Sequence, residues 1–176
     1  MALDGACELP ENVPKIEDPQ PARVHLNGAG LSMDTDDFYL RIARALSGCQ
    51  LVEQELKLYI TEALELVQKC ISGKLPFSMS GDDYADSSLE RLIEIFRKLS
   101  NNPTLVTQLR KFKEERNFLS HKGITHCLDP DGELDFATAS EFENRLVGIE
   151  PEAQRLRIAI HEEANKFRAH LWFDAL

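Results

Sequence analysis

The sequence predicts an all-α fold, an up-and-down four-helix bundle with a small β-hairpin between the third and fourth helices. Apolar residues recur at steps of three and four through most of the chain after residue 35, a spacing that places them on one helix face. The segments 87–90 and 138–141 have the spacing of a capping box, which marks the start of a helix. The chain has 176 residues, of which 43% are hydrophobic, enough for the core of one domain.

Residues 1–34 differ from the rest in composition. Pro10, Pro14, Pro19 and Pro21 exclude a long helix, because proline lacks a backbone N–H and clashes with the preceding turn. We expect an extended or disordered arm over 1–34, followed by one helical bundle domain over 35–176.

The first two helices are predicted over about 36–72 and 87–101. The first ends at Gly73, a residue typical of helix C-termini, and would be about 54 Å long at about 1.5 Å per residue. A helix of this length needs a bundle or a second subunit to cover its apolar stripe.

The third helix is predicted over 103–122, with Asn102 as its cap and proline as its first residue. Apolar and polar residues then alternate on either side of the turn sequence at 129–132, which predicts a hairpin over 124–137. The fourth helix is predicted over 138–173, and Pro151 inside it should kink it or divide it into two collinear pieces.

Composition bears on location and cofactors. No apolar run approaches the roughly 20 residues that span a membrane, and the N-terminus lacks a signal-peptide pattern, so we expect a cytoplasmic protein. Cys7, Cys49, Cys70 and Cys127 form no CxxC pair, and we interpret Cys49 and Cys70 as buried thiols on helix faces. His126-Cys127 has no second pair at ligand spacing, so we expect no metal and no cofactor.

The chain has a net charge of −10, but its basic residues gather in one segment. Residues 103–126 contain five basic and two acidic residues, a net charge of +3, so the remainder carries −13. A basic patch on an acidic body attracts a phosphate backbone to one place. The alternative is that these cations only solvate one face of a helix.

The predicted third helix carries one charged residue on its core-facing stripe, Arg116. An arginine there needs a partner or a solvated groove, because an unpaired buried charge is costly. Asn117, Ser120 and His121 lie within two turns of it. The stripe consists of Leu105, Leu109, Phe112, Arg116, Leu119 and Gly123.

The spacing of Arg116, Asn117 and His121 resembles the signature of the HEPN superfamily, small helical bundles of which many are metal-independent endoribonucleases. The organisation is similar over about residues 36–171, and the residue match is confined to this motif. The resemblance implies that His121 takes the proton of a ribose 2′-hydroxyl, that Arg116 holds the scissile phosphate, and that Asn117 binds the phosphate or orients His121. The products would be a 2′,3′-cyclic phosphate and a 5′-hydroxyl.

RNA contacts are expected beside this motif, from Arg110, Lys113, Ser120 and Lys122. Arg116 and His121 are five residues apart and so point about 140° from each other around a helix. We therefore expect a homodimer in which two third helices form one groove, as HEPN proteins typically do. A role in a toxin–antitoxin system or in phage defence is part of the same expectation.

The alternative is that Arg116 pairs with an acidic residue of a neighbouring helix and that His121 caps the helix C-terminus. The chain would then be a non-catalytic helical dimer that binds a protein partner, such as an antitoxin, or a nucleotide. A solvated cleft around Arg116 and His121 favours the nuclease, whereas a fully engaged salt bridge favours the binding module.

Overall fold

A computed structural model describes residues 34–173, which contain four α-helices and no β-strand, so the all-α prediction is confirmed for this range. The arm expected over 1–34 lies, apart from Asp34, outside the described residues. None of the described helices is long and apolar enough to span a membrane. The elements are α1 (Thr35–Ile71), η1 (Gly81–Tyr84), α2 (Leu89–Leu99), α3 (Pro103–Lys122), η2 (Thr125–Cys127) and α4 (Phe136–Phe173).

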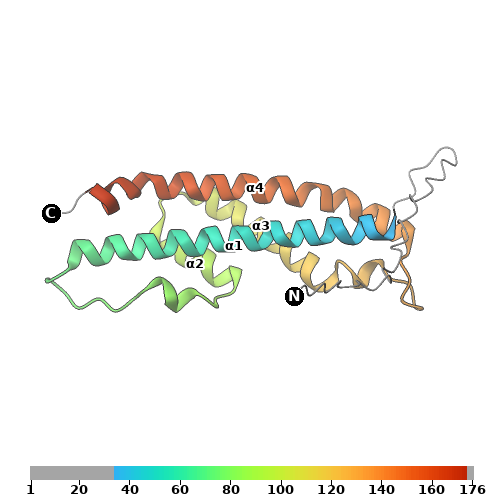
Figure 1. The fold of residues 1–176 in the computed structure, drawn as a ribbon, viewed down its shortest axis with the longest axis horizontal. Coiled ribbons are helices and arrows are strands. Elements are labelled where there is room, and N and C mark those ends of the chain that lie inside the picture. Colours follow the sequence, from blue (N-terminus) through green and yellow to red (C-terminus); the bar gives the residue numbers. More distant parts are fainter. Residues whose placement is uncertain (1–33, 174–176) are drawn as a thin grey trace, which may run out of the picture. The chain divides into compact units, whose positions relative to one another are not determined.

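The two long helices, α1 and α4, are parallel. Phe38 near the start of α1 packs on Phe142 near the start of α4, with ring centroids 6.3 Å apart. Further along both helices, Arg168 binds Glu62 at 2.9 Å. Figure 1 shows α1 and α4 side by side and running in the same direction. The predicted up-and-down order, in which the first and fourth helices are antiparallel, is therefore wrong.

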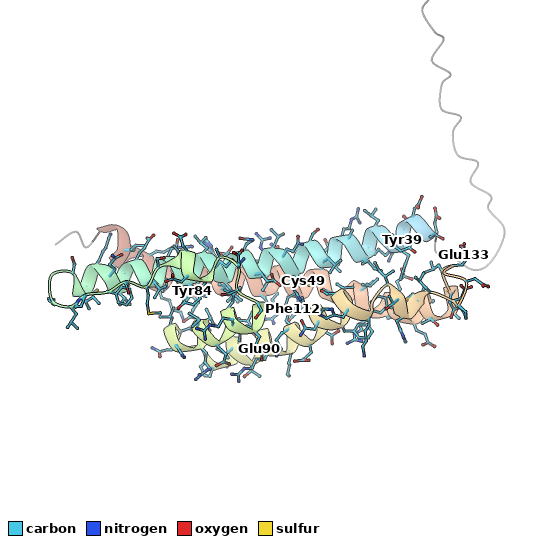
Figure 2. All side chains as sticks on the ribbon, turned by 90° about the horizontal axis from the view of Figure 1, so that it is seen from below. Tyr39, Cys49, Tyr84, Glu90, Phe112 and Glu133 are labelled. Carbon is cyan, nitrogen blue, oxygen red and sulfur yellow. The ribbon has the colours of Figure 1, made fainter. Side chains whose placement is uncertain are left out.

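The other two helices, α2 and α3, form an antiparallel pair. Glu90 at the start of α2 binds Lys113 (3.4 Å), and Glu94 one turn later binds Arg110 (2.6 Å), which is earlier in α3. Figure 2 shows this pair along one side of α1, with Glu90 labelled on α2.

The departure from an up-and-down order follows from the connection at 72–88. This segment returns along α1, so that the Lys57 ammonium binds the carbonyl oxygen of Ala85. Gly81 lies so close to α1 that a Cβ there would stand 1.9 Å from Thr61 Oγ1. Short connections force neighbouring helices to be antiparallel, whereas this long one lets α2 begin beside the middle of α1.

One hydrophobic core joins all four helices, and the predicted apolar stripes supply it. Burial of these side chains is the main stabilising contribution to a fold of this size. The largest fully buried side chains are Phe38, Cys49, Val52, Leu56, Ile60, Leu92, Ile93, Phe96, Leu105, Leu109, Leu156 and Ile160.

Polar side chains set the starts of α2 and α3. Asn102 Oδ1 accepts a hydrogen bond from the backbone N–H of Leu105 at 3.0 Å, and α3 begins at the predicted residue. The cap of α2 is Ser88 and not Ser87, because Ser88 Oγ accepts from the backbone N–H of Arg91 at 3.4 Å.

The fourth helix begins two residues earlier than predicted. Asp135 Oδ1 accepts from the backbone N–H of Ala137 (3.1 Å), and Asp135 Oδ2 accepts from the hydroxyl of Thr138 (2.6 Å). These bonds hold the pKa of Asp135 below its usual range. Asp135 therefore provides the polar group at the start of α4. The helix continues through the exposed Pro151 as one element, not as two pieces.

The predicted hairpin over 124–137 does not form. Among the described residues, this segment has one isolated antiparallel bridge, between Leu128 and Leu134, and no strand. Asp129 Oδ1 accepts from the backbone N–H groups of residues 131 and 133, and Gly132 has φ +86°, so a tight turn forms as predicted. The ladder does not extend because η2 precedes it and the cap of α4 follows it directly.

Two of the described cysteines are buried and one is exposed. Cys49 lies in the core as predicted, and Cys127 is also buried. Cys70 is exposed, so the prediction of a buried thiol there is wrong. It lies in the last turn of α1, among exposed residues near the end of that helix. Cys7 lies outside the described residues.

The buried carboxylate of Glu163 on α4 binds the turn between α2 and α3. It accepts hydrogen bonds from Ser100 Oγ (3.2 Å) and Asn102 Nδ2 (3.1 Å), and it pairs with Lys166. Burial acts to raise the pKa of Glu163, but the bonds from Lys166 and Asn102 outweigh it, and the pKa is lowered. Because Asn102 caps α3, Glu163 helps to fix the helix that carries the motif.

We expect Glu163→Gln to reduce the loss of stability in acid. The folded state keeps this carboxylate charged below the ordinary pKa of 4.5, whereas the unfolded chain protonates near it. The stabilisation is thus present above that pKa and is lost as the pH falls through the lower folded-state value. Urea unfolding between about pH 3 and pH 7 measures this slope. The matched control is the exposed neighbour Glu162→Gln, which should keep the wild-type profile. A Glu163→Gln profile parallel to wild type contradicts the assignment.

Candidate functional site

The centre of the candidate site is Arg116, which is held by α1. Arg116 Nε donates a hydrogen bond to Glu53 Oε1 at 3.0 Å, and the two side chains are 30% and 17% exposed. The stripe predicted for α3 is confirmed, since its apolar members are buried and Arg116 lies at its partly solvated edge. The ion pair offsets part of the desolvation cost of bringing this cation against the core.

The next residue, Asn117, contacts the same guanidinium. Arg116 Nη1 donates to Asn117 Oδ1 at 3.5 Å, the upper limit of a hydrogen bond. With Glu53 on Nε, this contact orients the guanidinium from a second direction. Among the described residues, Arg116 Nη2 has no hydrogen-bond partner. The guanidinium is therefore fixed on one side and keeps donors for an anion.

The histidine of the motif is at the end of α3. His121 is exposed, as are Ser120 and Lys122 on either side of it. Within the part of the chain that the structure describes, the His121 ring makes no hydrogen bond or ion pair. The last turn of α3 is closed by the backbone N–H of Gly123, which donates to the carbonyl oxygens of Phe118 and Leu119. His121 therefore does not serve as a cap and is open to solvent.

Two of the predicted phosphate-binding cations are engaged with α2. Arg110 binds Glu94 at 2.6 Å, and Lys113 lies 3.4 Å from both Glu90 and Glu114. The hydrogen bond from Arg110 lowers the pKa of Glu94. These pairs join α2 to α3 and reduce the positive charge that the sequence assigns to this segment. Arg110 and Lys113 lie near the middle of α3, whereas Ser120 and Lys122 are in its last turn.

A third group lies on the other side of the motif, where α3 meets α4. Arg145 of α4 places its guanidinium carbon 3.7 Å from the ring centroid of Phe118. Glu115 holds Arg145 with two hydrogen bonds, of 2.5 and 3.2 Å. The Phe118 ring also contacts Phe142 and His126, at centroid distances of 5.4 and 6.2 Å.

Beneath the Arg116–Glu53 pair lies Cys49, whose thiol is buried. Burial raises the pKa of Cys49 to about 11, although the positive charge of Arg116 acts to lower it. The group is a neutral thiol at pH 7 and packs as an apolar side chain. Within the described residues, no group of three or more His, Cys, Asp and Glu side chains is placed to hold a metal ion.

Sequence reasoning predicted the motif but not its neighbours in space. Glu53 is one polar residue among many in the first predicted helix, four residues after Cys49 on the apolar stripe, and this adjacency to the stripe is the signal that could have identified it. Arg145 and Glu115 are charged residues on different helices, and no spacing in the sequence connects them. The structure brings together Arg116, Asn117 and Glu53, and it leaves Arg110 and Lys113 paired elsewhere.

The Arg116–Glu53 pair should show a coupling free energy that is larger than that of a surface pair. A double-mutant cycle with Arg116→Ala and Glu53→Ala should give about 1 kcal/mol or more, because the pair is partly buried. The matched control is Arg155 with Glu152, an exposed pair within α4, for which about 0.3–0.5 kcal/mol is usual. Urea unfolding of each variant gives both values. Equal coupling in the two pairs contradicts the structural importance of Glu53.

Comparison of the chain with protein-family models, with curated proteins and with solved structures gave no match in any of the three.

Proposed function

We propose that the chain is a metal-independent endoribonuclease of HEPN type. The observation that carries this proposal is the state of Arg116: Glu53 and Asn117 fix its guanidinium, while 30% of the side chain stays exposed. A fixed cation with free donors is suited to stabilise charge that develops on a phosphate. His121, exposed five residues later on the same helix, supplies an imidazole, the side chain that most often serves as a general base.

In the proposed reaction, the ribose 2′-oxygen attacks the adjacent phosphorus. His121 takes the proton of the 2′-hydroxyl, and the bond from phosphorus to the 5′-oxygen breaks. The 5′-oxygen leaves with a proton from solvent, which gives a 2′,3′-cyclic phosphate and a 5′-hydroxyl. Arg116 binds the non-bridging oxygens, and Asn117 supports either the phosphate or the imidazole. Ser120 and Lys122 are the exposed neighbours that would contact the adjoining phosphates.

We propose further that two copies of α3 complete the site. Arg116 and His121 point about 140° apart on one helix, so one chain presents them to different directions. A two-fold dimer that pairs the last turns of α3 places Arg116 of each copy beside His121 of the other. A setting in toxin–antitoxin or phage-defence systems follows from the same family resemblance.

A second function, a non-catalytic module that binds a protein partner, is favoured by a different surface. Between α1 and α4, two adjoining hollows of about 540 and 520 Å³ are lined by residues of these two helices, among them the exposed apolar side chains Leu40, Leu51 and Val147. Arg44 and Glu150 line both hollows and form no ion pair within the described residues. Such a mixed groove suits an amphipathic helix.

RNA cleavage in the presence of a chelator distinguishes the two functions. Wild type should release products with a 2′,3′-cyclic phosphate, which end-group analysis detects. His121→Ala should lower the rate at least about 100-fold, the usual scale for a general acid–base group. Its folding stability should change by less than about 0.5 kcal/mol, because the side chain is exposed. His161→Ala, an exposed histidine of α4, is the matched control and should cleave like wild type.

The opposite result would assign the binding module. If wild type cleaves no RNA and Arg116→Ala alone lowers stability, then the Arg116–Glu53 pair is structural and the motif has no catalytic role. Glu53→Gln tests the role of Arg116 in cleavage separately, because it weakens the bond that holds the guanidinium and leaves Arg116 in place. It should reduce the rate of RNA cleavage, whereas Arg116→Ala should abolish cleavage.

Mixing two inactive variants tests the composite site. Arg116→Ala and His121→Ala homodimers should each be inactive, whereas a mixed dimer retains one site with Arg116 from one chain and His121 from the other. Refolding the two together should restore about a quarter of wild-type activity, if chains pair at random and each dimer has two sites. Light scattering on the same samples gives the mass. A monomer at micromolar concentration, or a mixture without activity beside an active wild type, contradicts a composite site.

A further inference from the structure

We infer that the Arg145 guanidinium, stacked on Phe118, is a platform for an unpaired RNA base beside the proposed cleavage site. This inference rests on the proposed function, since it assigns a base-binding surface to the same site. The platform consists of Arg145, Phe118, Glu115 and His126.

The first argument is the rigidity of the platform. The Arg145 guanidinium lies 3.7 Å from the Phe118 ring centroid, and two hydrogen bonds from its Nε and Nη2 bind both oxygens of Glu115. One face of the guanidinium is covered by the ring and one edge by the carboxylate. The side chain is nevertheless 41% exposed, so a large part of it remains accessible to a ligand. A flat group already fixed in place loses little conformational entropy when a second flat group stacks on it.

The second argument is charge. Glu115 neutralises Arg145, which weakens its attraction for a phosphate but leaves its plane intact. Arginine planes and aromatic rings are the surfaces on which proteins stack unpaired bases. A paired base, in contrast, has both faces covered by its neighbours in the helix and cannot reach such a plane. The pair Arg145–Glu115 therefore favours a base over a phosphate and a single strand over a duplex.

The third argument is position. Phe118 and His121 are three residues apart and so are neighbours on the surface of α3. Going around α3 at about 100° per residue, the side chains occur in the order Arg116, Ser120, Asn117, His121, Phe118. His121 thus lies between the Arg116 cation and the Arg145 platform. In the composite site proposed above, a nucleotide chain would therefore meet Arg116 of one copy and then His121 and the platform of the other copy, which are neighbours on the same α3.

The fourth argument is the space beside the platform. Arg145 also lines a hollow of about 340 Å³ between α3 and α4. Its apolar wall includes Phe112 and Ile149, and a Cβ added at Gly148 in the same wall would meet no other atom within 4 Å. Lys111 contributes a cation to the rim of this hollow. Glu115 and Glu152 also line the hollow and balance the charges of Lys111 and Arg145, so it suits a flat, uncharged base.

Binding of a non-cleavable single strand tests the platform separately from catalysis. The probe is a 2′-O-methyl RNA 10-mer with 2-aminopurine near its centre, whose fluorescence falls when the base stacks, and the full chain is titrated into it. We expect Arg145→Ala to weaken binding about 5- to 100-fold, the range for loss of one stacked base. Arg145→Lys keeps the charge but not the plane, and it should weaken binding to a similar extent.

Two controls make the result specific. Arg41→Ala removes an exposed arginine of α1 that is paired with one carboxylate, Glu143, outside the hollow, and that is stacked on no ring among the described residues, and it should bind like wild type. The same 10-mer in a duplex should bind weakly and without dependence on Arg145. Thermal melting of each variant shows whether it is folded.

The possible outcomes separate this inference from the proposed function. Unchanged binding by Arg145→Ala or wild-type binding by Arg145→Lys overturns the platform, even where wild type cleaves unmodified RNA. Loss of quenching in both variants, with no cleavage of unmodified RNA by wild type, supports the platform and overturns the nuclease. Absence of any binding to the single strand overturns both.

Discussion

The architecture depends on the seam between the parallel helices α1 and α4. Both are long and carry one apolar stripe, and neither can bury its stripe alone. The helices approach closely at Gly48, where a Cβ would lie 3.2 Å from the Cβ of Ala153. With this seam in place, the antiparallel pair α2–α3 needs to cover only one side of the two long helices. In that position, α3 forms an ion pair with α1 between Arg116 and Glu53. The site geometry is thus a consequence of how two long helices share one core.

How far the sequence predicts this fold depends on whether the determinants are local. Helix positions and the cap of α3 were predictable, because Asn102, a following proline and a regular stripe are all read from neighbouring residues. The capping-box assignment for α4 failed, since Asp135 competes successfully for the same backbone groups. The hairpin prediction was wrong because Asp129 stabilises only the turn, and the single bridge beside it does not extend into strands.

The directions of the helices and the composition of the site depend on contacts between residues that are distant in the sequence. They were therefore not predictable from neighbouring residues. The parallel order of α1 and α4 requires knowing that the segment at 72–88 returns along α1, which involves Gly81 fitting against Thr61. Likewise, the spacing of neighbouring residues shows that Arg116 lies on the stripe of α3. Which of the 30 acidic residues pairs with it depends on how the helices pack, and that residue is Glu53. A solvated Arg116 was expected for a nuclease and a salt-bridged one for a binding module. The structure shows features of both, since Nε forms a salt bridge with Glu53 while part of the side chain is exposed to solvent.

The parallel seam also has a consequence for biosynthesis. Its contacts connect residues about a hundred positions apart, such as Glu62 with Arg168, which are separated by 106. A ribosome adding about 5–20 residues per second needs roughly 5–20 s to make the intervening chain. During that interval α1 has no α4 to cover its apolar stripe, and α2–α3 covers only part of it. A nascent chain of this sequence therefore presents a long amphipathic helix to chaperones before its own last helix can displace them.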